Sequence, residues 1–389
     1  MFSRRTNWEL KLNPLALSLQ KIRQQGDPIL DLTESNPTHC HFRYLSKELL
    51  TPLIDPANLR YDPSPKGALK ARESIADFYF RKGVHVHPDQ IFLTSSTSEA
   101  YSFLFRLLCD PNDHLLVPQP SYPLLDYLTV LDDLIPDSYR LLYNNGWQVN
   151  VTVLKKLIHS RTRGILMVNP NNPTGSFIKE KELSVMDQLA HEHSLALISD
   201  EVFADYIFLE NSSRIKSIAN HKASLSFTLG GISKSLGLPQ MKLSWLIASG
   251  PSQLRDSAVS RLEVISDTYL SPNIPAQNAL GEWLKLTTLI QQEIQERIRC
   301  NREFLLQRCE EMDDLEYLIS EGGWYAILRI SSIMDEEKFV LALLEKDHVW
   351  AHPGYFFDLE GESHIVLSLL PDPNVFKEGV ERIIARVKD

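Results

Sequence analysis

Three polar side chains that could do chemistry fall at regular intervals near the middle of the chain, each beside a short apolar run. They are the amide of Asn169, the carboxylate of Asp200 and the amine of Lys234, 31 and 34 residues apart (200 − 169 and 234 − 200). Asn169 opens a loop of prolines, asparagines and glycine, which offers a side-chain amide at a strand end. Asp200 lies just beyond four apolar residues, so its carboxylate should emerge partly buried and could balance a cationic ligand atom.

Each of these residues also has a plain structural explanation. The loop after residue 168 could be a tight turn, Asp200 could cap a helix, and Lys234 could be a solvated surface lysine. The order and spacing favour a shared site, because all three side chains then fall at the ends of successive strands.

The elements that must position these residues alternate between strands and helices. Short apolar runs separated by helical patterns are typical of a mostly parallel sheet that is buried on both faces. In such a sheet, ligands bind just beyond the carboxyl ends of the strands. The predicted strands are 91–93, 115–117, 165–168, 195–198, 226–229 and 245–248, and helices are predicted at 99–108 and 179–191.

The two ends of the chain predict a second, smaller α+β unit. We expect a large domain over residues 46–280, and a small domain formed by 1–45 together with 281–389. The N-terminal part predicts a helix within 8–25, a short strand at 29–32 and a helix at 69–80. The C-terminal part predicts a long helical stretch at 276–312, strands at 324–330 and 365–369, and helices at 336–346 and 375–387.

Composition limits the classes of function. The chain has 389 residues, of which 43% are hydrophobic and 23% charged, which suits a large globular core. A formal net charge of −10 argues against a surface for nucleic acid or an anionic membrane. The four cysteines are scattered and predict neither a disulfide framework nor a metal site. We find no signal peptide and no apolar run long enough to span a bilayer, so we expect a cytoplasmic protein.

Three motifs together resemble the fold-type I aminotransferases of the aspartate aminotransferase superfamily. They are NPNNPTG from Asn169, SDEVFADY from Ser199 and SKSLG from Ser233, and the resemblance extends from about Leu32 to the C-terminus. It implies an α/β fold with a large domain, whose mostly parallel seven-stranded sheet is flanked by helices, and a small α+β domain. It also implies pyridoxal 5′-phosphate as cofactor, amino-group transfer between an amino acid and a 2-oxo acid by a ping-pong mechanism, and a homodimer.

The resemblance also assigns roles around the cofactor. Lys234 would carry the cofactor and then move the substrate proton, which requires an amine of depressed pKa. Asp200 would pair with the protonated pyridine nitrogen, and Asn169 would donate a hydrogen bond to the phenolic oxygen. Tyr122 matches the aromatic residue that stacks on the ring, although a core tyrosine would fit the same position.

For the phosphate group, the sequence offers hydroxyls and backbone N–H groups at a helix N-terminus. Ser96, Thr97 and Ser98 match the family's phosphate loop, although a plain helix cap uses the same residue types. Ser233 is also predicted to bind the cofactor. Tyr61 matches a tyrosine that reaches the phosphate of the neighbouring subunit.

Some cofactor-side positions depart from the family pattern. Phe203 replaces a tyrosine, which removes one hydrogen bond to the phenolic oxygen and predicts a higher pKa for the lysine–cofactor linkage than in relatives. Lys242 replaces a phosphate-binding arginine; it keeps the charge and loses the bidentate fork. Gly231 stands where a hydroxyl residue usually contacts the phosphate.

The largest departure concerns the substrate. Val366 stands where relatives have the arginine that binds the substrate α-carboxylate, and a valine cannot do so. We predict Arg329, on the facing strand, as a replacement; an exposed strand arginine is the plain alternative. Ser35 and Asn36 are predicted to approach the substrate from the family's entry loop.

Other functions remain possible on the same scaffold. A lyase that cleaves at Cβ of a cysteine-like substrate is favoured by the changes at Phe203 and Val366, and pyruvate and ammonia would reveal it. A cofactor-sensing DNA-binding regulator would need a basic module ahead of the first strand, for which we find no room. A catalytically idle paralogue is poorly motivated while Asn169, Asp200 and Lys234 are all present.

Overall fold

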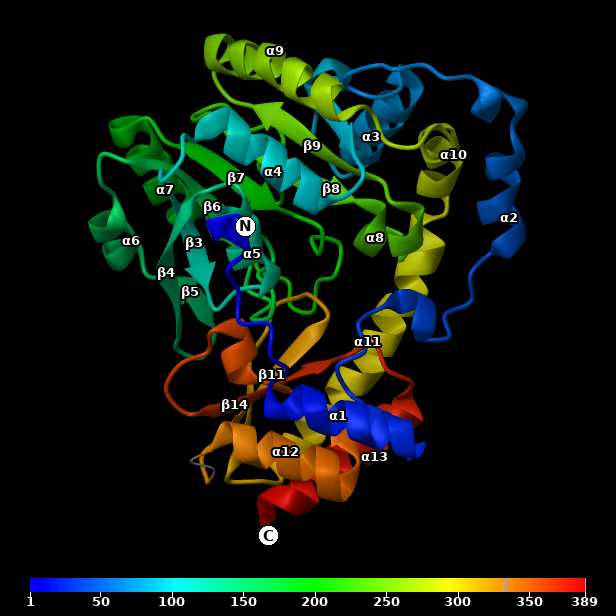
Figure 1. The fold of residues 1–389 in the computed structure, drawn as a ribbon, viewed down its shortest axis with the longest axis vertical. Helices are drawn as coiled ribbons and strands as arrows, with labels where there is room; N and C mark the ends of the chain where they lie inside the picture. Colours follow the sequence, from blue (N-terminus) through cyan, green and yellow to red (C-terminus); the bar gives the residue numbers. More distant parts are fainter. Residues whose placement is uncertain (333–334, 389) are drawn as a thin grey trace.

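The computed structural model describes residues 1–332 and 335–388, and it contains a large upper unit and a smaller lower unit (Figure 1). The upper unit is built on one twisted sheet with the strand order β2-β9-β8-β7-β6-β3-β4-β5. Neighbouring strands from β8 through β7, β6 and β3 to β4 run parallel, whereas β9 is antiparallel to both β2 and β8. The strands are β2 Ile91–Thr94, β3 His114–Gln119, β4 Ile135–Tyr143, β5 Trp147–Val149, β6 Thr162–Val168, β7 Ala196–Asp200, β8 Ser226–Gly231 and β9 Ser244–Ser249.

The seven-stranded, mostly parallel sheet that we predicted is confirmed, and the short strand β5 adds an eighth at its edge. All six apolar runs are strands. The sequence pattern missed β4 and β5, because β4 lies near the edge of the sheet and leaves several side chains exposed. Its residues therefore do not form a continuous apolar run.

Helices cover both faces of this sheet. On one face α4 Thr97–Leu108, α5 Leu124–Leu131 and α9 Ser252–Tyr269 share a buried cluster with Phe92, Leu229 and Leu246 of the sheet. The opposite face is covered by α3 Leu69–Arg81, α6 Val151–Leu157, α7 Glu180–His193 and α10 Ile274–Lys285. The sheet is therefore buried between two apolar layers, as its continuous apolar strands predicted.

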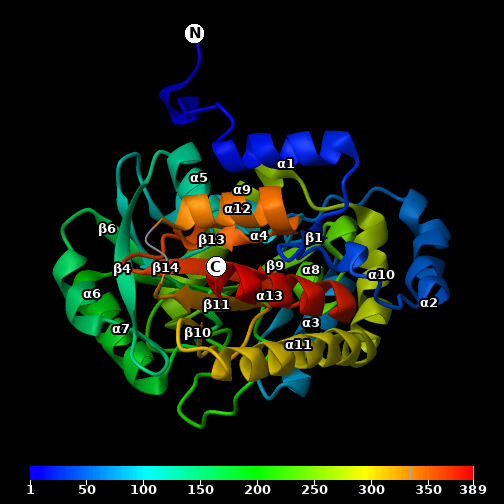
Figure 2. The same ribbon diagram turned by 90° about the horizontal axis from the view of Figure 1, so that it is seen from below.

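The smaller unit has an antiparallel sheet in the order β10-β11-β14-β13, and a parallel pair in which N-terminal β1 lies beside β12. Seen from below, α1 lies along α12, while α11 and α13 cover another side (Figure 2). Its strands are β1 Leu30–Asp31, β10 Leu315–Leu318, β11 Tyr325–Ile330, β12 Val349–Trp350, β13 His352–Pro353 and β14 Ser363–Ser368. Its helices are α1 Pro14–Gln25, α11 Thr287–Glu310, α12 Glu336–Asp347 and α13 Pro373–Lys388.

The domain boundaries at residues 46 and 280 stay a prediction. Helix α10 runs through residue 280 without a break and contacts α3, and α11 then leads into the smaller unit. The remaining short elements are α2 Ser46–Leu50, α8 Ile232–Ser235, and the 3-10 turns Arg4–Thr6, Pro37–His39, Thr51–Ile54, Pro56–Leu59, Pro88–Gln90, Pro239–Met241 and Gly354–Phe357.

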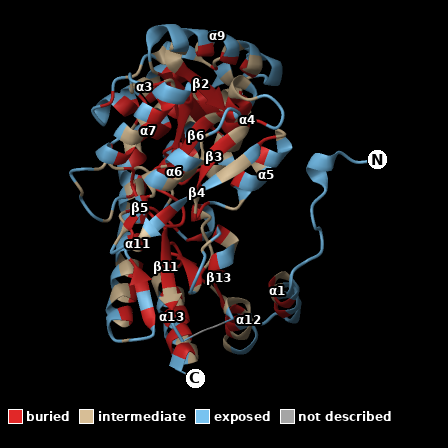
Figure 3. Cartoon of the chain, turned by 90° about the vertical axis from the view of Figure 1, so that its left-hand side faces the viewer, coloured by how far each residue is buried: buried red, intermediate tan, exposed pale blue. Residues whose placement is uncertain are grey.

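The first residues form an extended arm ahead of α1 (Figure 3), and Arg5 and Trp8 of this arm contact Asp133 and Tyr127 in the region of α5. Helix α1 starts because Asn13 caps its first turn, accepting a hydrogen bond from the Ala16 N–H at 2.7 Å, and Pro14 takes the first helical position. Among the described helices, none is both long and apolar enough to cross a membrane.

Candidate active site

The strand ends that carry Asn169, Asp200 and Lys234 are neighbours in the sheet. Strand β7 lies between β6 and β8, with Val168 opposite Asp200 and Asp200 opposite Leu229. The Asn169 N–H donates to the Asp200 carbonyl at 2.8 Å, which joins the first two strand ends directly. Lys234 follows β8 within the short helix α8. The sheet therefore brings the amide, the carboxylate and the amine to one edge.

The Lys234 amine lies among aromatic rings. Its Nζ is 4.7 Å from the centre of the Trp324 ring and 5.4 Å from that of Phe203. Burial lowers the pKa of Lys234 to about 8, although the charge of Asp200 acts in the opposite direction. The backbone is fixed as well, because the Tyr206 hydroxyl donates to the Lys234 carbonyl at 2.6 Å. A buried amine of lowered pKa is a good nucleophile and proton carrier near neutral pH.

Asp200 is held by two donors. The Tyr101 hydroxyl donates to its Oδ2 at 2.9 Å, and the Val202 N–H donates to Oδ1 at 3.1 Å. Burial nevertheless raises the pKa of Asp200 to about 6, against the lowering effect of these bonds and of Lys234. A buried carboxylate of this kind gains stability when a cationic atom lies beside it.

Asn169 retains a free donor. Its side-chain oxygen accepts the Ile178 N–H at 2.9 Å, so the amide nitrogen Nδ2 must point the other way. That nitrogen is buried and has no hydrogen-bond partner among the described residues. Buried donors are normally paired, so this one indicates a missing acceptor. The phenolic oxygen of pyridoxal phosphate would be such an acceptor.

Aromatic side chains surround this group. Phe203 is 4% exposed, and its ring meets those of Trp324 at 5.3 Å and Tyr325 at 6.4 Å. Tyr122 is 45% exposed, while burial of its hydroxyl, followed by the charge of Asp200, raises its pKa. Sequence reasoning missed Trp324 and Tyr325, because their contact with the strand ends comes from a distant strand.

The segment predicted to bind phosphate lies at the same sheet edge. Ser96 caps helix α4, and its hydroxyl accepts the Glu99 N–H at 3.1 Å. Thr97 and Ser98 occupy the first turn, where backbone N–H groups lack intrahelical partners. Strand β9 begins beside the end of β2, so the exposed Lys242 precedes β9 at this edge too. Ser233 is the second residue of α8, directly before Lys234.

The predicted substrate residues separate into two groups. Burial raises the pKa of Tyr325 to about 12, and the side chain of Ser35 acts in the opposite direction, which places the entry loop beside the aromatic residues. The Asn36 side chain accepts the Thr38 N–H at 3.1 Å and caps a short turn.

Arg329 is not free to bind a carboxylate. It forms ion pairs with Glu316 and with Glu362, the latter at 2.8 Å. Its side chain is 34% exposed, which is closer to the plain alternative of an exposed strand arginine and does not support Arg329 as the replacement for the missing arginine. Val366 is fully buried in β14, opposite Ile327.

Tyr61 lies on the surface of this chain, with 68% of the residue exposed. It contributes nothing to the group around Lys234 within one chain. Its predicted role needs a second subunit and stays a prediction.

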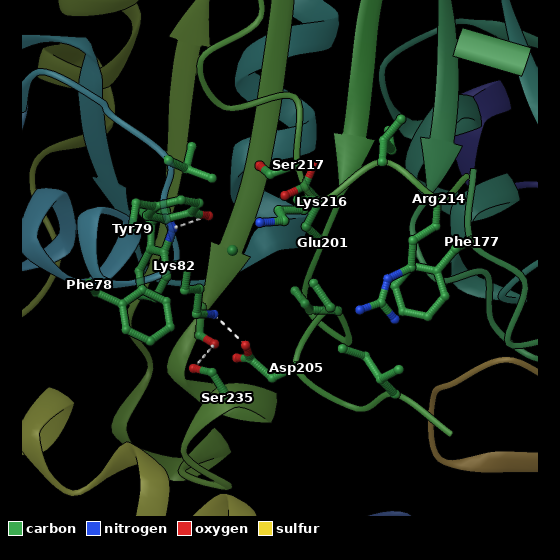
Figure 4. Close-up of a pocket in the computed structure, with 18 residues that line it drawn as sticks. Phe78, Tyr79, Lys82, Phe177, Glu201, Asp205, Arg214, Lys216, Ser217 and Ser235 are labelled. Carbon is green, nitrogen blue, oxygen red and sulfur yellow. Dashed lines mark hydrogen bonds and ion pairs between the residues drawn. The ribbon is translucent and has the colours of Figure 1, made fainter. Parts of the chain in front are cut away.

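A cavity of about 250 Å³ lies next to the strand ends (Figure 4). It is lined by Glu201 and Ser235, the residues that follow Asp200 and Lys234, whereas the side chains of those two residues do not line it. Lys82 and Asp205 form an ion pair at its wall. The cavity is therefore adjacent to the candidate site and separate from it.

A group of metal-binding residue types occurs elsewhere. His114, Asp137 and His159 lie within 4.8 Å of one another at the opposite ends of the strands. Asp137 accepts from both rings, at 2.8 Å and 3.4 Å. The Arg161 N–H donates to Nδ1 of His159, which leaves the ring proton on the nitrogen facing Asp137. Hydrogen bonds account for this cluster without a metal ion.

Together, the fold and the site define a class of protein: an α/β enzyme that uses a buried lysine, a carboxylate and an amide at adjacent strand ends to hold a cofactor. The family model of aminotransferase class I and II matches residues 29–383. The chain therefore belongs to this family, which depends on pyridoxal phosphate, and its activity is amino-group transfer between an amino acid and a 2-oxo acid.

Named relatives agree with this assignment. Alanine aminotransferase of Mycobacterium tuberculosis (strain ATCC 25618 / H37Rv) is 27% identical over 383 residues, covering 95% of this chain and 88% of the relative. Glutamate-pyruvate aminotransferase AlaA of Escherichia coli (strain K12) is 26% identical over 369 residues, covering 92% and 90%. The solved alanine aminotransferase from Pyrococcus furiosus shares the fold, with a TM-score of 0.89 over the whole of both chains at 24% identity.

Proposed function

We propose that Lys234, Asp200 and Asn169 perform amino-group transfer in this protein, with a small neutral amino acid such as alanine as donor. The observation that carries the proposal is the buried Lys234 amine beside the Asp200 carboxylate, at the strand ends where Asn169 leaves an amide donor free. The choice of donor is supported by two relatives that are named for alanine or for glutamate and pyruvate.

Each residue has a defined task in the proposed mechanism. Pyridoxal phosphate, when bound, supplies a conjugated ring that can accept the electron pair from the substrate Cα. Lys234 takes the proton from Cα and returns it, since its lowered pKa keeps part of the amine neutral near pH 7. Asp200 would keep a cationic ring nitrogen protonated, and Asn169 would orient the ring oxygen.

Ser96, Thr97, Ser98, Ser233 and Lys242 would hold the phosphate. Backbone N–H groups at the start of a helix favour an anion, and Lys242 adds a positive charge. Tyr122 and Phe203 would enclose the ring from the two sides, and water would be excluded by the aromatic residues beside Lys234.

His352 is our candidate for the substrate carboxylate. It lies opposite Val366 in the register of β13 and β14, so both side chains share one sheet face. Tyr325 belongs to the same face, because it lies opposite Ser368, two residues beyond Val366. The ring nitrogen Nδ1 of His352 is buried and has no hydrogen-bond partner among the described residues. Burial lowers its pKa to about 4, so the ring is neutral until an anion arrives.

We further propose a cytoplasmic homodimer with shared active sites. The exposed N-terminal arm carries Phe2, Leu10 and Leu12, and the segment before Tyr61 exposes Ile54 and Leu59. Exposed apolar segments of this kind are typical of subunit contacts. A second chain would cover them and bring its Tyr61 to a phosphate group.

The test is the visible absorption spectrum of the purified protein before and after single amino acids are added. Bleaching of the yellow band by alanine, with release of pyruvate and no ammonia, is the expected result. Pyruvate together with ammonia from a cysteine-like substrate would instead favour the lyase. A protein without a band after incubation with pyridoxal phosphate would contradict the proposal.

A further inference from the structure

Ser244 lies at the centre of the predicted phosphate-binding edge. It is the first residue of β9, and β9 runs between β2 and β8. In the register of these strands, Ser244 is opposite Thr94 on one side and Gly231 on the other. Residues 95–98 follow Thr94, and the segment with Ser233 and Lys234 follows Gly231. Ser244 therefore lies between the two segments that we assign to the cofactor.

The Ser244 side chain points to the face from which α4 begins. Side chains alternate along a strand, so Ser244 shares a face with Leu246. Leu246 belongs to the buried cluster that also contains Ala100 and Leu104 of α4. The hydroxyl is therefore directed toward the sheet face on which the first turn of α4 presents its free N–H groups.

Gly231 is small because Ser244 needs the space. A Cβ added to Gly231 would collide with the Ser244 hydroxyl oxygen and lie 3.1 Å from the Ser244 Cβ. The backbone of Gly231 is extended, with φ at −179°, so it does not itself require glycine. The side chain that Gly231 lacks is replaced in space by the side chain of Ser244.

The Ser244 hydroxyl has no protein partner. The residue is 2% exposed, yet no hydrogen bond joins its Oγ to any described residue. Thr94, which lies opposite Ser244 on β2, does have a partner, because its hydroxyl donates to the Ser96 carbonyl at 3.0 Å. The Ser244 Oγ atom is not completely enclosed by protein, so a small part of its surface stays accessible. A ligand oxygen could complete its hydrogen bonding.

We propose that the Ser244 hydroxyl donates a hydrogen bond to the phosphate of the cofactor. Ser244 on β9 would thus supply the hydroxyl that relatives have on β8 at the position of Gly231. The inference rests on the proposed function, because it assumes that pyridoxal phosphate binds at this edge. The Ser244 hydroxyl would replace the hydroxyl–phosphate contact that a glycine at position 231 cannot make. Charge-assisted hydrogen bonds to phosphate are among the stronger ones in proteins.

Cofactor affinity tests this inference without any measurement of turnover. We expect Ser244→Ala to weaken pyridoxal phosphate binding to the cofactor-free protein about tenfold, as loss of one charge-assisted hydrogen bond implies. Pyridoxal, which has no phosphate, should bind Ser244→Ala and the wild type equally. Ser226→Ala is the matched control, because it removes an unpaired hydroxyl from β8, at the strand end away from Gly231.

Moving the hydroxyl back gives an independent test. Ser244→Gly should lose affinity, and the double variant Gly231→Ser with Ser244→Gly should regain most of it, because the side chains exchange places. Unchanged affinity in Ser244→Ala would overturn the inference, as would an equal loss for pyridoxal and pyridoxal phosphate. If the wild type itself binds no pyridoxal phosphate, the proposed function fails instead.

Discussion

The cofactor side and the substrate side of this site are built in different ways. On the cofactor side, Asn169, Asp200 and Lys234 come from three adjacent parallel strands, and backbone contacts fix their positions. On the substrate side, the small-domain sheet presents Val366 and His352, and the nearby Arg329 is held by two carboxylates. The first side follows the family pattern, and the second departs from it. We therefore expect the chemistry to be retained and the recognition of the substrate to differ.

The difference has a physical basis. Lys234 and Asp200 adjust each other's charge inside a buried group, so replacing either one disturbs the other. The proposed substrate-side residues Val366 and His352 lie on a separate sheet, so we expect that they can change one at a time. We expect substitutions on the cofactor side to lower the rate, and those on the substrate side to raise KM.

The largest expected effect is that of Lys234→Ala. Removing both the nucleophile and the proton carrier should lower kcat about 10⁴-fold and abolish the visible band of the lysine–cofactor linkage. Rapid-mixing absorbance with alanine measures this. Lys216→Ala, which removes an exposed lysine, should keep the band. Retained turnover in Lys234→Ala would show that the assignment is wrong.

Asp200→Asn should lower kcat by about 100- to 1,000-fold, because a neutral amide cannot stabilise a cationic ring atom in a buried site. Steady-state kinetics with alanine and a 2-oxo acid are the measurement. The control is Glu201→Gln, which changes the adjacent buried carboxylate. A decrease in kcat in Glu201→Gln without a decrease in Asp200→Asn would contradict the assignment of Asp200 and indicate Glu201 instead.

The cofactor-free protein should lose stability as the pH rises from about 4 to about 6. The pKa of Asp200 is raised from 3.8 to about 6 in the folded state, so the folded form binds the extra proton in this interval and is destabilised once it is lost. The contribution is at most about 3 kcal/mol. Urea unfolding at pH 4.5 and 6.5 measures it, and Asp200→Asn should flatten the slope. An equal slope in both proteins would contradict the assignment.

His352→Phe should raise KM for both substrates about tenfold and change kcat much less, because it removes a donor for the carboxylate and keeps an aromatic side chain beside Phe356 and Phe357. The matched control is His364→Phe, on the same sheet face beside Arg329. Equal KM values in the wild type and His352→Phe would exclude His352 from substrate binding.

The smallest expected effect is that of Arg329→Gln. Its ion pairs with Glu316 and Glu362 are partly exposed, so we expect less than about 1 kcal/mol in stability and less than a twofold change in KM. Kinetics and thermal unfolding of the variant measure both. A tenfold rise in KM would restore Arg329 as the carboxylate-binding residue and weaken the contrast between the two sides.

Much of the cofactor side could be predicted from the sequence. Apolar runs followed by Asn169, Asp200 and the Lys234 motif place three side chains at strand ends, and a parallel sheet gathers such ends at one edge. The edge strand β4 was missed, because an exposed strand has no continuous apolar run. Arg329 was a candidate because it is a cation on the strand facing Val366. Its ion pairs could not be foreseen, because the carboxylate partners Glu316 and Glu362 lie 13 and 33 residues away in the sequence (329 − 316 and 362 − 329).

By itself, the sequence determined the fold class, the family and the placement of Asn169, Asp200 and Lys234 at neighbouring strand ends, because these depend on local patterns and on the order of strands along the chain. Only the tertiary structure decided what lies beside Lys234, which partners hold Arg329, and that Ser244 fills the space left by Gly231. These facts depend on contacts between strands that are distant in sequence. Such contacts are set by register and packing, and no local pattern encodes them.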